Sequence, residues 1–495
     1  MSLLSFIAKP YARWVTNAVM RRAMDPAVTQ LGVLRQLLRF GGSTDFGRTH
    51  KLHHVHDHQG LAQAVPLRDY EAFRPYLDRI ITGEQDVLWP GAPLYLCKTS
   101  GTTSGAKYIP ITRESLPNHI DSARRALLAY IAHSGRTDFV DGKMIFLQGS
   151  PVLDRSGRIP TGRLSGIVAN HVPSYLLKNR LPSFATNSMP DWEAKVEAVV
   201  EETRAQDMRL ISGIPSWVRM YLERLLERTG KATVKEVFPN FSLFVYGGVN
   251  YGPYRSGMEA LIGGSVPSVE LFPASEGFIA YQDKRAEDGL LLVLDNGIYF
   301  EFVPTSDIGK PNPRRLSIEQ VQLGVNYALV LHTNAGLWGY EIGDTIKFVS
   351  LAPPRVVVTG RTKHFTSAFG EHVIAEEVES ALREAMVVVP CEVAEFTLAP
   401  QLAPADGGLP YHEWFIEFAL PPTDTGRLAN AIDAAMRNRN IYYRDLIKGS
   451  VLRPLVLTTV ARGGFGAWMK AHGMNDAQSK MPRLANDRRY VDGLR

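Results

Sequence analysis

The chain has 495 residues, of which 45% are hydrophobic and 21% are charged, and its formal net charge is +5. This composition is typical of a globular protein, which excludes a disordered or fibrous chain, and the length suits a large domain with a smaller companion. The small net charge argues against a nucleic-acid-binding surface. Cys97 and Cys391 lie far apart without a metal-binding spacing, so we expect no disulfide framework and a cytoplasmic, reducing location.

The first 28 residues are mildly apolar but carry Lys9, Pro10, Arg13 and two further arginines. No uninterrupted apolar segment in the chain is long enough to cross a bilayer. We therefore expect an amphipathic helix that packs on the body of the protein, and no stable membrane insertion.

The middle of the chain alternates short apolar runs with helical periods. We predict strands within 144–150, 209–215 and 241–248, and helices over 191–207 and 215–230, the second bounded by Pro215 and Gly230. This alternation is typical of an α/β domain, in which ligands bind at the carboxyl ends of the strands. From residue 290 the pattern changes to consecutive strands, and the Asp295-Asn296-Gly297 turn predicts a hairpin within 290–304.

After Arg361, two helix-like and three strand-like segments and a last short helix predict a compact α+β unit. We expect an α/β fold with two domains: residues 1–360 form a large N-terminal domain with α/β layers and a β-rich subdomain, and residues 361–495 form a small C-terminal domain. Gly360-Arg361-Thr362-Lys363 lies at this boundary, where a pivot would be expected.

A hydroxyl- and glycine-rich stretch, KTSGTTSGAK over residues 98–107, follows a predicted strand. Its amides and hydroxyls can surround a polyphosphate, while Lys98 or Lys107 supplies positive charge. Three residues separate Gly101 from Gly105 and alanine follows, which argues against a Walker A loop. A polar surface turn is the alternative.

Two carboxylates occur in unusual surroundings. Glu276 lies in the apolar stretch LFPASEGF, where it could meet Mg²⁺ beside phosphates or remain a solvated loop residue. Asp344 follows a glycine within YEIGDTIKF, where it could accept hydrogen bonds from ribose hydroxyls or belong to a β-bulge.

Several histidines and tryptophans allow more than one interpretation. His53, His54, His56 and His58 fit a solvated connector better than a metal site. His332 and His364 could deprotonate an amine, but a structural role is commoner. Trp338, Trp414 and Trp468 fit core packing at least as well as ligand binding.

These motifs, in this order, resemble those of the acyl-adenylate-forming enzymes. TSGTTSGAKYIP is similar to the phosphate-binding motif of the Gretchen Hagen 3 family of acyl acid amido synthetases, in its bacterial form, and FPASEG and GLWGYEIGD are similar to its second and third motifs. The segments at 43–50 and 65–91 and NDAQSKMPRLAND at 475–487 extend the resemblance over nearly the whole chain.

The resemblance implies a ligase that uses ATP and Mg²⁺. It would join a carboxylic acid to AMP with release of pyrophosphate, and then transfer the acyl group to an amine, such as that of an amino acid. The residues implied to hold the β- and γ-phosphates are Ser100, Gly101, Thr102, Thr103, Ser104 and Gly105.

The resemblance also implies the remaining roles. Glu276 would bind Mg²⁺, and Ser275 with Gly247 and Gly248 would border the adenine. Asp344 would bind the ribose, and Arg361 the ribose or the α-phosphate. Lys480 would stabilise charge at the α-phosphate, so Lys480, Arg361 and Thr103 are the catalytic candidates, and Lys363 is the candidate pivot. An acyl-CoA ligase and a non-catalytic binding protein of the same fold are the alternative functions.

Overall fold

The computed structural model describes residues 3–102, 105–172, 178–190, 192–248, 251, 255–362, 365–371, 373–472 and 481–494. Its large domain is built on a mixed sheet of 11 strands in the order β11-β12-β13-β14-β10-β9-β8-β7-β6-β3-β5. Neighbouring strands from β5 to β8 are parallel. They are β3 (Lys143–Phe146), β5 (Arg180–Leu181), β6 (Met208–Ser212), β7 (Leu243–Gly247) and β8 (Ser268–Ala274).

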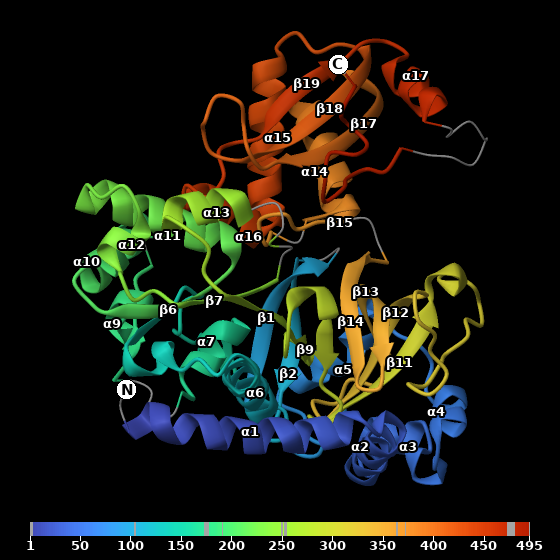
Figure 1. Cartoon of the computed structure of the whole chain (residues 1–495). Helices are drawn as coiled ribbons and strands as arrows, with labels where there is room; N and C mark the ends of the chain where they lie inside the picture. The colour runs from blue at the N-terminus through green and yellow to red at the C-terminus, as the bar shows by residue number, and fades with distance from the viewer. Residues whose placement is uncertain are drawn as a thin grey trace.

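Helices cover both faces of this parallel half. Alternate residues of β7 point to opposite sides of the sheet, and those on each side pack against a different set of helices. Phe244 and Tyr246 pack with α10 (Trp192–Thr203), α11 (Pro215–Thr229), α12 (Val234–Val237) and α13 (Arg255–Ile262). Leu243 and Val245 pack with α1 (Leu3–Ala23) and α6 (Leu116–Ser134). The three layers confirm the α/β class, and α1 lies along the base of the large domain as expected (Figure 1).

The other half of the sheet is antiparallel and forms the expected β-rich part. Its strands are β9 (Gly277–Tyr281), β10 (Leu290–Leu292), β11 (Ile298–Pro304), β12 (Asn326–Thr333), β13 (Tyr340–Leu351) and β14 (Pro354–Arg361). The largest apolar cluster packs this half against the segment of residues 33–80. The shorter helices of the large domain are α2 (Pro26–Gly41), α3 (Asp45–Thr49), α4 (His58–Ala64), α5 (Tyr70–Ile81), α7 (Leu164–Ala169) and α9 (Phe184–Asn187).

The predicted hairpin at Asp295-Asn296-Gly297 is wrong. β10 pairs with β9 and β14, whereas β11 pairs with β12, so the strands on either side of the turn do not meet. The turn instead anchors helices: Asp295 forms ion pairs with Arg22 of α1 at 2.5 Å and with Arg125 of α6 at 2.6 Å. Every residue of β11 is buried, so both faces of this edge strand are covered, unlike those of a hairpin with one solvated face.

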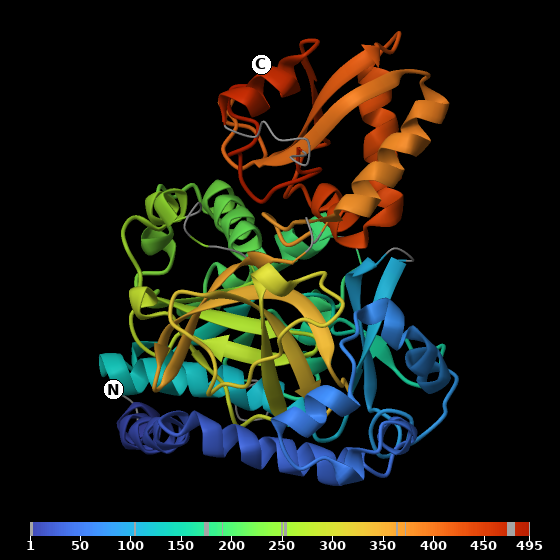
Figure 2. The ribbon, with the colours of Figure 1, turned by 90° about the vertical axis from the view of Figure 1, so that its right-hand side faces the viewer.

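The hydroxyl-rich stretch belongs to a hairpin of β1 (Tyr95–Thr102) and β2 (Gly105–Ile111), in which Thr102 is paired with Gly105. The strand thus runs beyond Lys98, where the sequence pattern ended it. A third short strand, β4 (Thr161–Gly162), pairs in parallel with β1. The hairpin points from the large domain towards the C-terminal domain (Figure 2).

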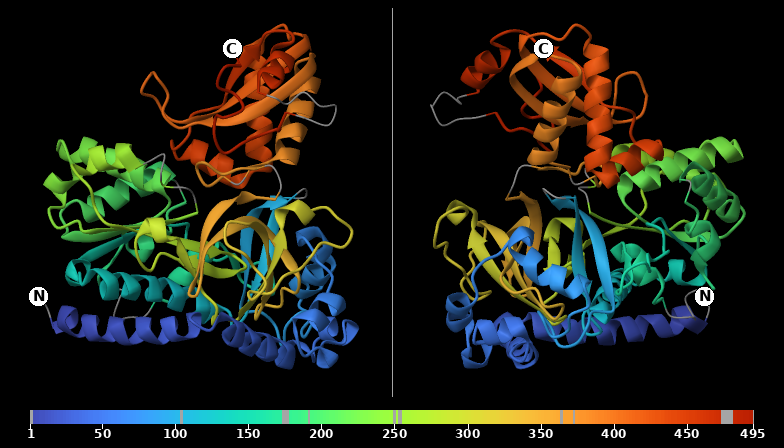
Figure 3. Two further views of the ribbon diagram at one scale, coloured as in Figure 1. Left: turned by 45° about the vertical axis from the view of Figure 1, so that its right-hand side comes forward. Right: turned by 180° about the vertical axis from the view of Figure 1, so that it is seen from behind.

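The C-terminal part carries a sheet of three strands in the order β17-β18-β19, with helices packed on it. Its elements are β15 (Phe365–Thr366), β16 (Val373–Ile374), α14 (Ala375–Val388), β17 (Glu392–Gln401), β18 (Tyr411–Leu420), α15 (Thr425–Arg439), α16 (Ile441–Lys448), β19 (Val456–Val460) and α17 (Gly464–Ala471). This smaller unit lies over one side of the large domain (Figure 3). The sequence pattern anticipated all its longer elements except α16.

A buried ionic cluster surrounds Glu301, which is fully buried. It accepts hydrogen bonds from Arg315 at 3.0 Å and from His332 at 2.8 Å, and His58 lies 3.0 Å away. Burial opposes the charge on Glu301, but His332, His58 and Arg315 outweigh burial and lower its pKa. His332 is therefore a structural residue, as the commoner interpretation held.

The described part of the chain contains no helix that is long and apolar enough to span a bilayer. The three tryptophans singled out in the sequence are all buried, and Trp338 donates a hydrogen bond to the Leu88 carbonyl at 3.2 Å. Core packing accounts for them.

We expect His119 of α6 to make the protein less stable in mild acid. Its side chain is 4% exposed, its Nδ1 has no hydrogen-bond partner among the described residues, and burial lowers its pKa to about 4. Between pH 6.5 and 4 the unfolded chain binds a proton that the folded chain does not, so the free energy of unfolding falls as the pH falls. From pH 7 to pH 5 this contribution is about 2 kcal/mol.

Urea unfolding at both pH values checks this expectation. Between pH 7 and pH 5 the free energy of unfolding should fall by about 2 kcal/mol less in His119→Gln and His119→Leu than in the parent protein, whatever the stability of the variants at pH 7. An unchanged pH dependence in both variants would contradict it.

Candidate active site

A cavity of about 780 Å³ lies between the two domains at the upper edge of the large sheet. Its wall includes residues of all three motifs. Those on its wall are Lys98, Thr99, Lys107, Gly248, Ser275, Glu276, Asp344 and Gly360. Ser367, Tyr442, Asn486, Asp487 and Arg489 line it from the C-terminal side. We call it the nucleotide cavity, after the ligand that the resemblance implies.

Glu276 lies in the tight connection between β8 and β9, where Ala274 is paired with Gly277. Its side chain is 8% exposed, and Tyr340, the first residue of β13, donates a hydrogen bond to its Oε1 at 3.1 Å. Ser275 accepts a hydrogen bond from the Cys97 thiol of β1 at 3.3 Å. Side-chain contacts thus join the second motif to the third, and to the strand that carries the first.

Asp344 lies in β13 directly after Gly343, whose φ of 90° is in the left-handed region. Opposite it, the pairing of β12 with β13 shifts register between Ala328 and Val330, which marks a bulge. Asp344 is 7% exposed and lines the nucleotide cavity. The bulge interpretation is therefore confirmed, and ribose binding by Asp344 stays a prediction. Arg361 is its backbone partner on β14.

Two glycines end β7 at the edge of the cavity. A Cβ atom on Gly247 would lie 2.5 Å from the Leu271 carbonyl oxygen, so no side chain fits there. Gly248 has a φ of 84° and lines the cavity. Their backbone allows a flat ligand group to approach the end of β7 closely.

Several predicted site residues cannot be placed as side chains. Thr103, Ser104, Lys480, Lys363 and His364 lie outside the described residues. The backbones of Ser100, Gly101 and Thr102 lie in β1 and that of Gly105 in β2. Their roles and that of Arg361 stay predictions.

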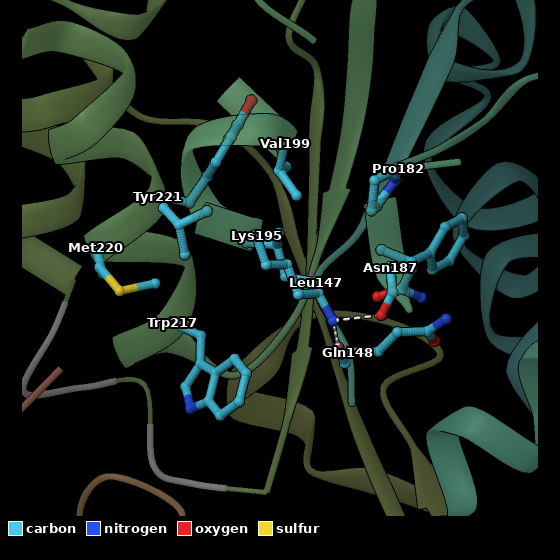
Figure 4. A pocket seen from close by; sticks show the side chains of 11 residues that line it. Leu147, Gln148, Pro182, Asn187, Lys195, Val199, Trp217, Met220 and Tyr221 are labelled. Carbon is cyan, nitrogen blue, oxygen red and sulfur yellow. Dashed lines mark hydrogen bonds between the residues drawn. The ribbon is translucent and has the colours of Figure 1, made fainter. Parts of the chain in front are cut away.

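A smaller pocket beside the nucleotide cavity was not anticipated. It is largely apolar, holds about 20 Å³ of open space, and includes Trp217 and Gln148, which also line the nucleotide cavity (Figure 4). Lys195 of α10 points into it and donates to the main-chain oxygens of Asn187 at 2.8 Å and Gln148 at 3.4 Å. Burial, with a smaller contribution from Arg163, lowers the pKa of Lys195 to about 8.

Helix α16 forms the contact between the domains at this site. Arg163, directly before α7, bonds Asp445 of α16 at 2.6 Å, and its guanidinium lies 4.5 Å from the ring centre of Tyr442. Burial raises the pKa of the Tyr442 hydroxyl, which Arg163 and the Thr99 side chain partly offset. The helix could have been found from the sequence, because Asn440 caps it and accepts from the Tyr443 amide at 2.8 Å.

The side chains of the nucleotide cavity can hold a hard cation only together with a ligand that supplies further oxygen atoms. Among the described residues, no three His, Cys, Asp or Glu side chains gather as a metal site. Glu276 is a nearly buried carboxylate for which the described residues provide one neutral donor, Tyr340. A buried carboxylate in such surroundings favours a cation nearby, and Mg²⁺ is commonly bound by one or two carboxylates plus substrate phosphates.

Comparison with family descriptions places the chain in a known family. Residues 17–196 match the GH3 family N-terminal domain, residues 291–361 the GH3 family central domain, and residues 376–489 the GH3 family C-terminal domain. Together the three matches span more than half of the chain, in the order of the family. The protein therefore belongs to the Gretchen Hagen 3 (GH3) family, as the motifs predicted.

Characterised relatives are distant in sequence. A jasmonoyl–L-amino acid synthetase of Nicotiana attenuata is 21% identical over 65% of this chain and 67% of its own length. A jasmonoyl–L-amino acid synthetase of Oryza sativa subsp. japonica is 21% identical over 93% of each chain. An indole-3-acetic acid-amido synthetase of Arabidopsis thaliana is 21% identical over 52% of this chain and 46% of its own length.

Among solved structures, the GH3.15 acyl acid amido synthetase superposes with a TM-score of 0.59 at 17% identity, covering 95% of this chain and 93% of that one. The same enzyme in complex with 2,4-DB gives a TM-score of 0.58 at 16% identity, covering 97% of this chain and 95% of that one. These likenesses confirm a mixed α/β fold similar to that of the GH3.15 acyl acid amido synthetase, with a large N-terminal and a smaller C-terminal domain.

We expect Asp445→Asn to loosen α16 from the large domain. The Arg163–Asp445 pair is partly exposed, so its loss should cost about 1 kcal/mol and speed the amide exchange of Ile441–Lys448 roughly fivefold. Asp406→Asn is the matched control, since Asp406 bonds Arg453 at 2.8 Å within the C-terminal domain. Hydrogen-exchange mass spectrometry would contradict the role of the pair if both variants left α16 equally protected.

Proposed function

We propose that the protein is an ATP-dependent acyl acid amido synthetase, which adenylates a carboxylic acid and transfers the acyl group to an amine, such as that of an amino acid. The observation that carries the proposal is that Glu276 and Asp344, both nearly buried, line one cavity with the base of the β1–β2 hairpin. Family membership and the names of the relatives support the same activity.

The residue roles follow from this arrangement and from the motifs. Ser100 to Gly105 hold the β- and γ-phosphates at the end of the hairpin, and Glu276 holds the Mg²⁺ that neutralises them. Asp344 accepts hydrogen bonds from the ribose, and its strand partner Arg361 contacts the ribose or the α-phosphate. The adenine is bordered by Gly247, Gly248 and Ser275.

In the first half-reaction the carboxylate attacks the α-phosphate and pyrophosphate leaves. The chain contributes mainly positioning and charge stabilisation, with Thr103, Arg361 and Lys480 nearest the reacting phosphate in this proposal. Lys480 reaches the site from the C-terminal domain. The nearby residues Asn486, Asp487 and Arg489 line the nucleotide cavity, which supports that approach.

We also propose the finer placements that the motifs suggested. The domains divide as 1–360 and 361–495, with Lys363 as the pivot for a change of conformation between the half-reactions. The chain represents the bacterial form of the family. A cytoplasmic location is supported by Cys97 and Cys391, which are both buried and free of a disulfide.

The direct test is pyrophosphate release from ATP and Mg²⁺ over a panel of aromatic, indole and aliphatic acids, with and without pooled amino acids, and product masses. We expect acid-dependent release and an amide product. Lys480→Ala is the control: it should bind ATP and release pyrophosphate at least 100-fold more slowly, because its charge acts mainly in the transition state. A thioester formed with added coenzyme A, and no amide, would favour the acyl-CoA ligase instead.

Glu276→Gln should raise the Mg²⁺ concentration needed for half-maximal adenylation about tenfold, or about 1.4 kcal/mol, because an amide binds a hard cation less strongly than a carboxylate. Tyr340→Phe removes only the hydrogen bond that orients Glu276, so its effect should be smaller. Mg²⁺ titrations of both variants, with unfolding midpoints to verify the fold, decide the role. An unchanged Mg²⁺ requirement in Glu276→Gln would remove it from the metal site.

A further inference from the structure

A second cavity, of about 890 Å³, lies on the other side of the β1–β2 hairpin from Glu276 and Asp344. The two cavities meet at Lys98, Gly149, Arg163 and Trp217, which line both. Neither Glu276 nor Asp344 lines the second cavity. Its volume is in the range of small-molecule sites, and its position beside the nucleotide cavity gives it access to an activated acyl group.

The wall of this second cavity is strongly basic. Six of its side chains are cationic, and they come from β1, from the segments of residues 158–163 and 195, and from α16: Lys98, Arg158, Arg163, Lys195, Arg444 and Lys448. Only two carboxylates, Asp154 and Asp445, lie on the same wall. A concave site with such an excess of one charge attracts ligands of the opposite charge.

The two carboxylates are engaged within the protein. Asp445 bonds Arg163 at 2.6 Å and lies 3.8 Å from Arg444. Asp154 accepts hydrogen bonds from the Ser156 amide at 2.9 Å and hydroxyl at 2.7 Å, which lower its pKa, as does Lys98 to a smaller extent. Asp445 is paired with Arg163 and Asp154 offsets part of the charge of Lys98, so the wall keeps an excess of cations.

Three of those cations, Lys98, Arg158 and Lys448, form no hydrogen bond or ion pair within the described part of the chain. Lys98 acts on Asp154 only from beyond ion-pair distance. The three cations approach the cavity from three separate elements, a strand, a loop and α16 of the C-terminal domain. Cations on different elements around one space can bind anionic groups at more than one point of a ligand.

We propose that the second cavity binds the acceptor amine and that this acceptor carries two carboxylates, as a dicarboxylic amino acid does. The inference rests on the proposed amido synthetase activity and names its acceptor class. The amine nitrogen attacks the acyl carbonyl, the C–N bond forms, the bond to the AMP oxygen breaks, and the amine protons pass to solvent. Arg158 and Lys448 hold the carboxylates, while Lys98 lies at the junction with the nucleotide cavity.

The test compares acceptors in the full-length protein. With one acid held constant, a dicarboxylic, a monocarboxylic neutral and a carboxylate-free amine are assayed for amide formation, and we expect the dicarboxylic amine to have the highest kcat/KM. In Arg158→Gln and in Lys448→Gln, KM for that acceptor should rise about tenfold or more, as expected for a lost charge-assisted contact. Arg155→Gln is the matched control, because Arg155 is an exposed arginine on the same loop that does not line the cavity.

The outcomes separate the inference from the activity on which it rests. Preference for an uncharged amine, or an unchanged acceptor KM in both variants, overturns the inference while leaving the amido synthetase intact. A rise in KM for ATP in place of the acceptor assigns the cavity to phosphates and also overturns it. Absence of acid-dependent pyrophosphate release in the parent protein contradicts the proposed function itself. In that case calorimetry tests the inference independently, and failure of a dicarboxylic amino acid to bind overturns it.

Discussion

The site depends on keeping two carboxylates almost out of water at one edge of a mixed sheet. A buried carboxylate is costly unless a donor or a cation meets it, so Glu276 and Asp344 require surroundings that the protein cannot vary freely. The Tyr340 hydroxyl meets Glu276, and a bulge after Gly343 places Asp344 on the cavity wall. Both arrangements originate in β13, which makes this strand the support of the site.

That strand is held in place by the antiparallel half of the sheet. β13 lies between β12 and β14, and the buried Glu301 cluster joins β11 to β12 through His332. His332 also accepts a hydrogen bond from the Gly339 amide at 3.2 Å, directly before Tyr340. A change in the cluster would thus shift the start of β13, and with it the donor to Glu276.

Local patterns predicted much of this architecture. Period-two and helical runs located β3, β6, β7, α11 and the C-terminal strands, because these elements bury a regular apolar face. The Asp295–Gly297 hairpin failed because turn residues report a change of direction and not which strands pair; the partner of β11 was set by burial on both faces. Glu276 and Asp344 were identified from short motifs, because the residues next to them in the sequence fix where their side chains lie.

The sequence could not reveal the residues that line the cavities from distant segments. Lys195, Trp217 and Tyr442 belong to ordinary amphipathic helices, and nothing in their local pattern distinguishes a wall of a cavity from a core. Lys195 and Trp217 meet where α10 packs against α11, whereas Tyr442 reaches the nucleotide cavity because α16 lies against Arg163. Such information resides in the packing of domains, which periodicity does not encode.

The position of Lys98 has a consequence for the order of events. It lines both cavities, so the negative phosphates of ATP and a negatively charged acceptor would be drawn to the same ammonium group. Two anions that contact the same ammonium group repel each other substantially in a partly dehydrated site. Departure of pyrophosphate removes the competing charge, so the acceptor binds more favourably after adenylation than before it. Under the proposed activity and acceptor, Lys98 between the cavities would couple the release of pyrophosphate to the entry of the acceptor.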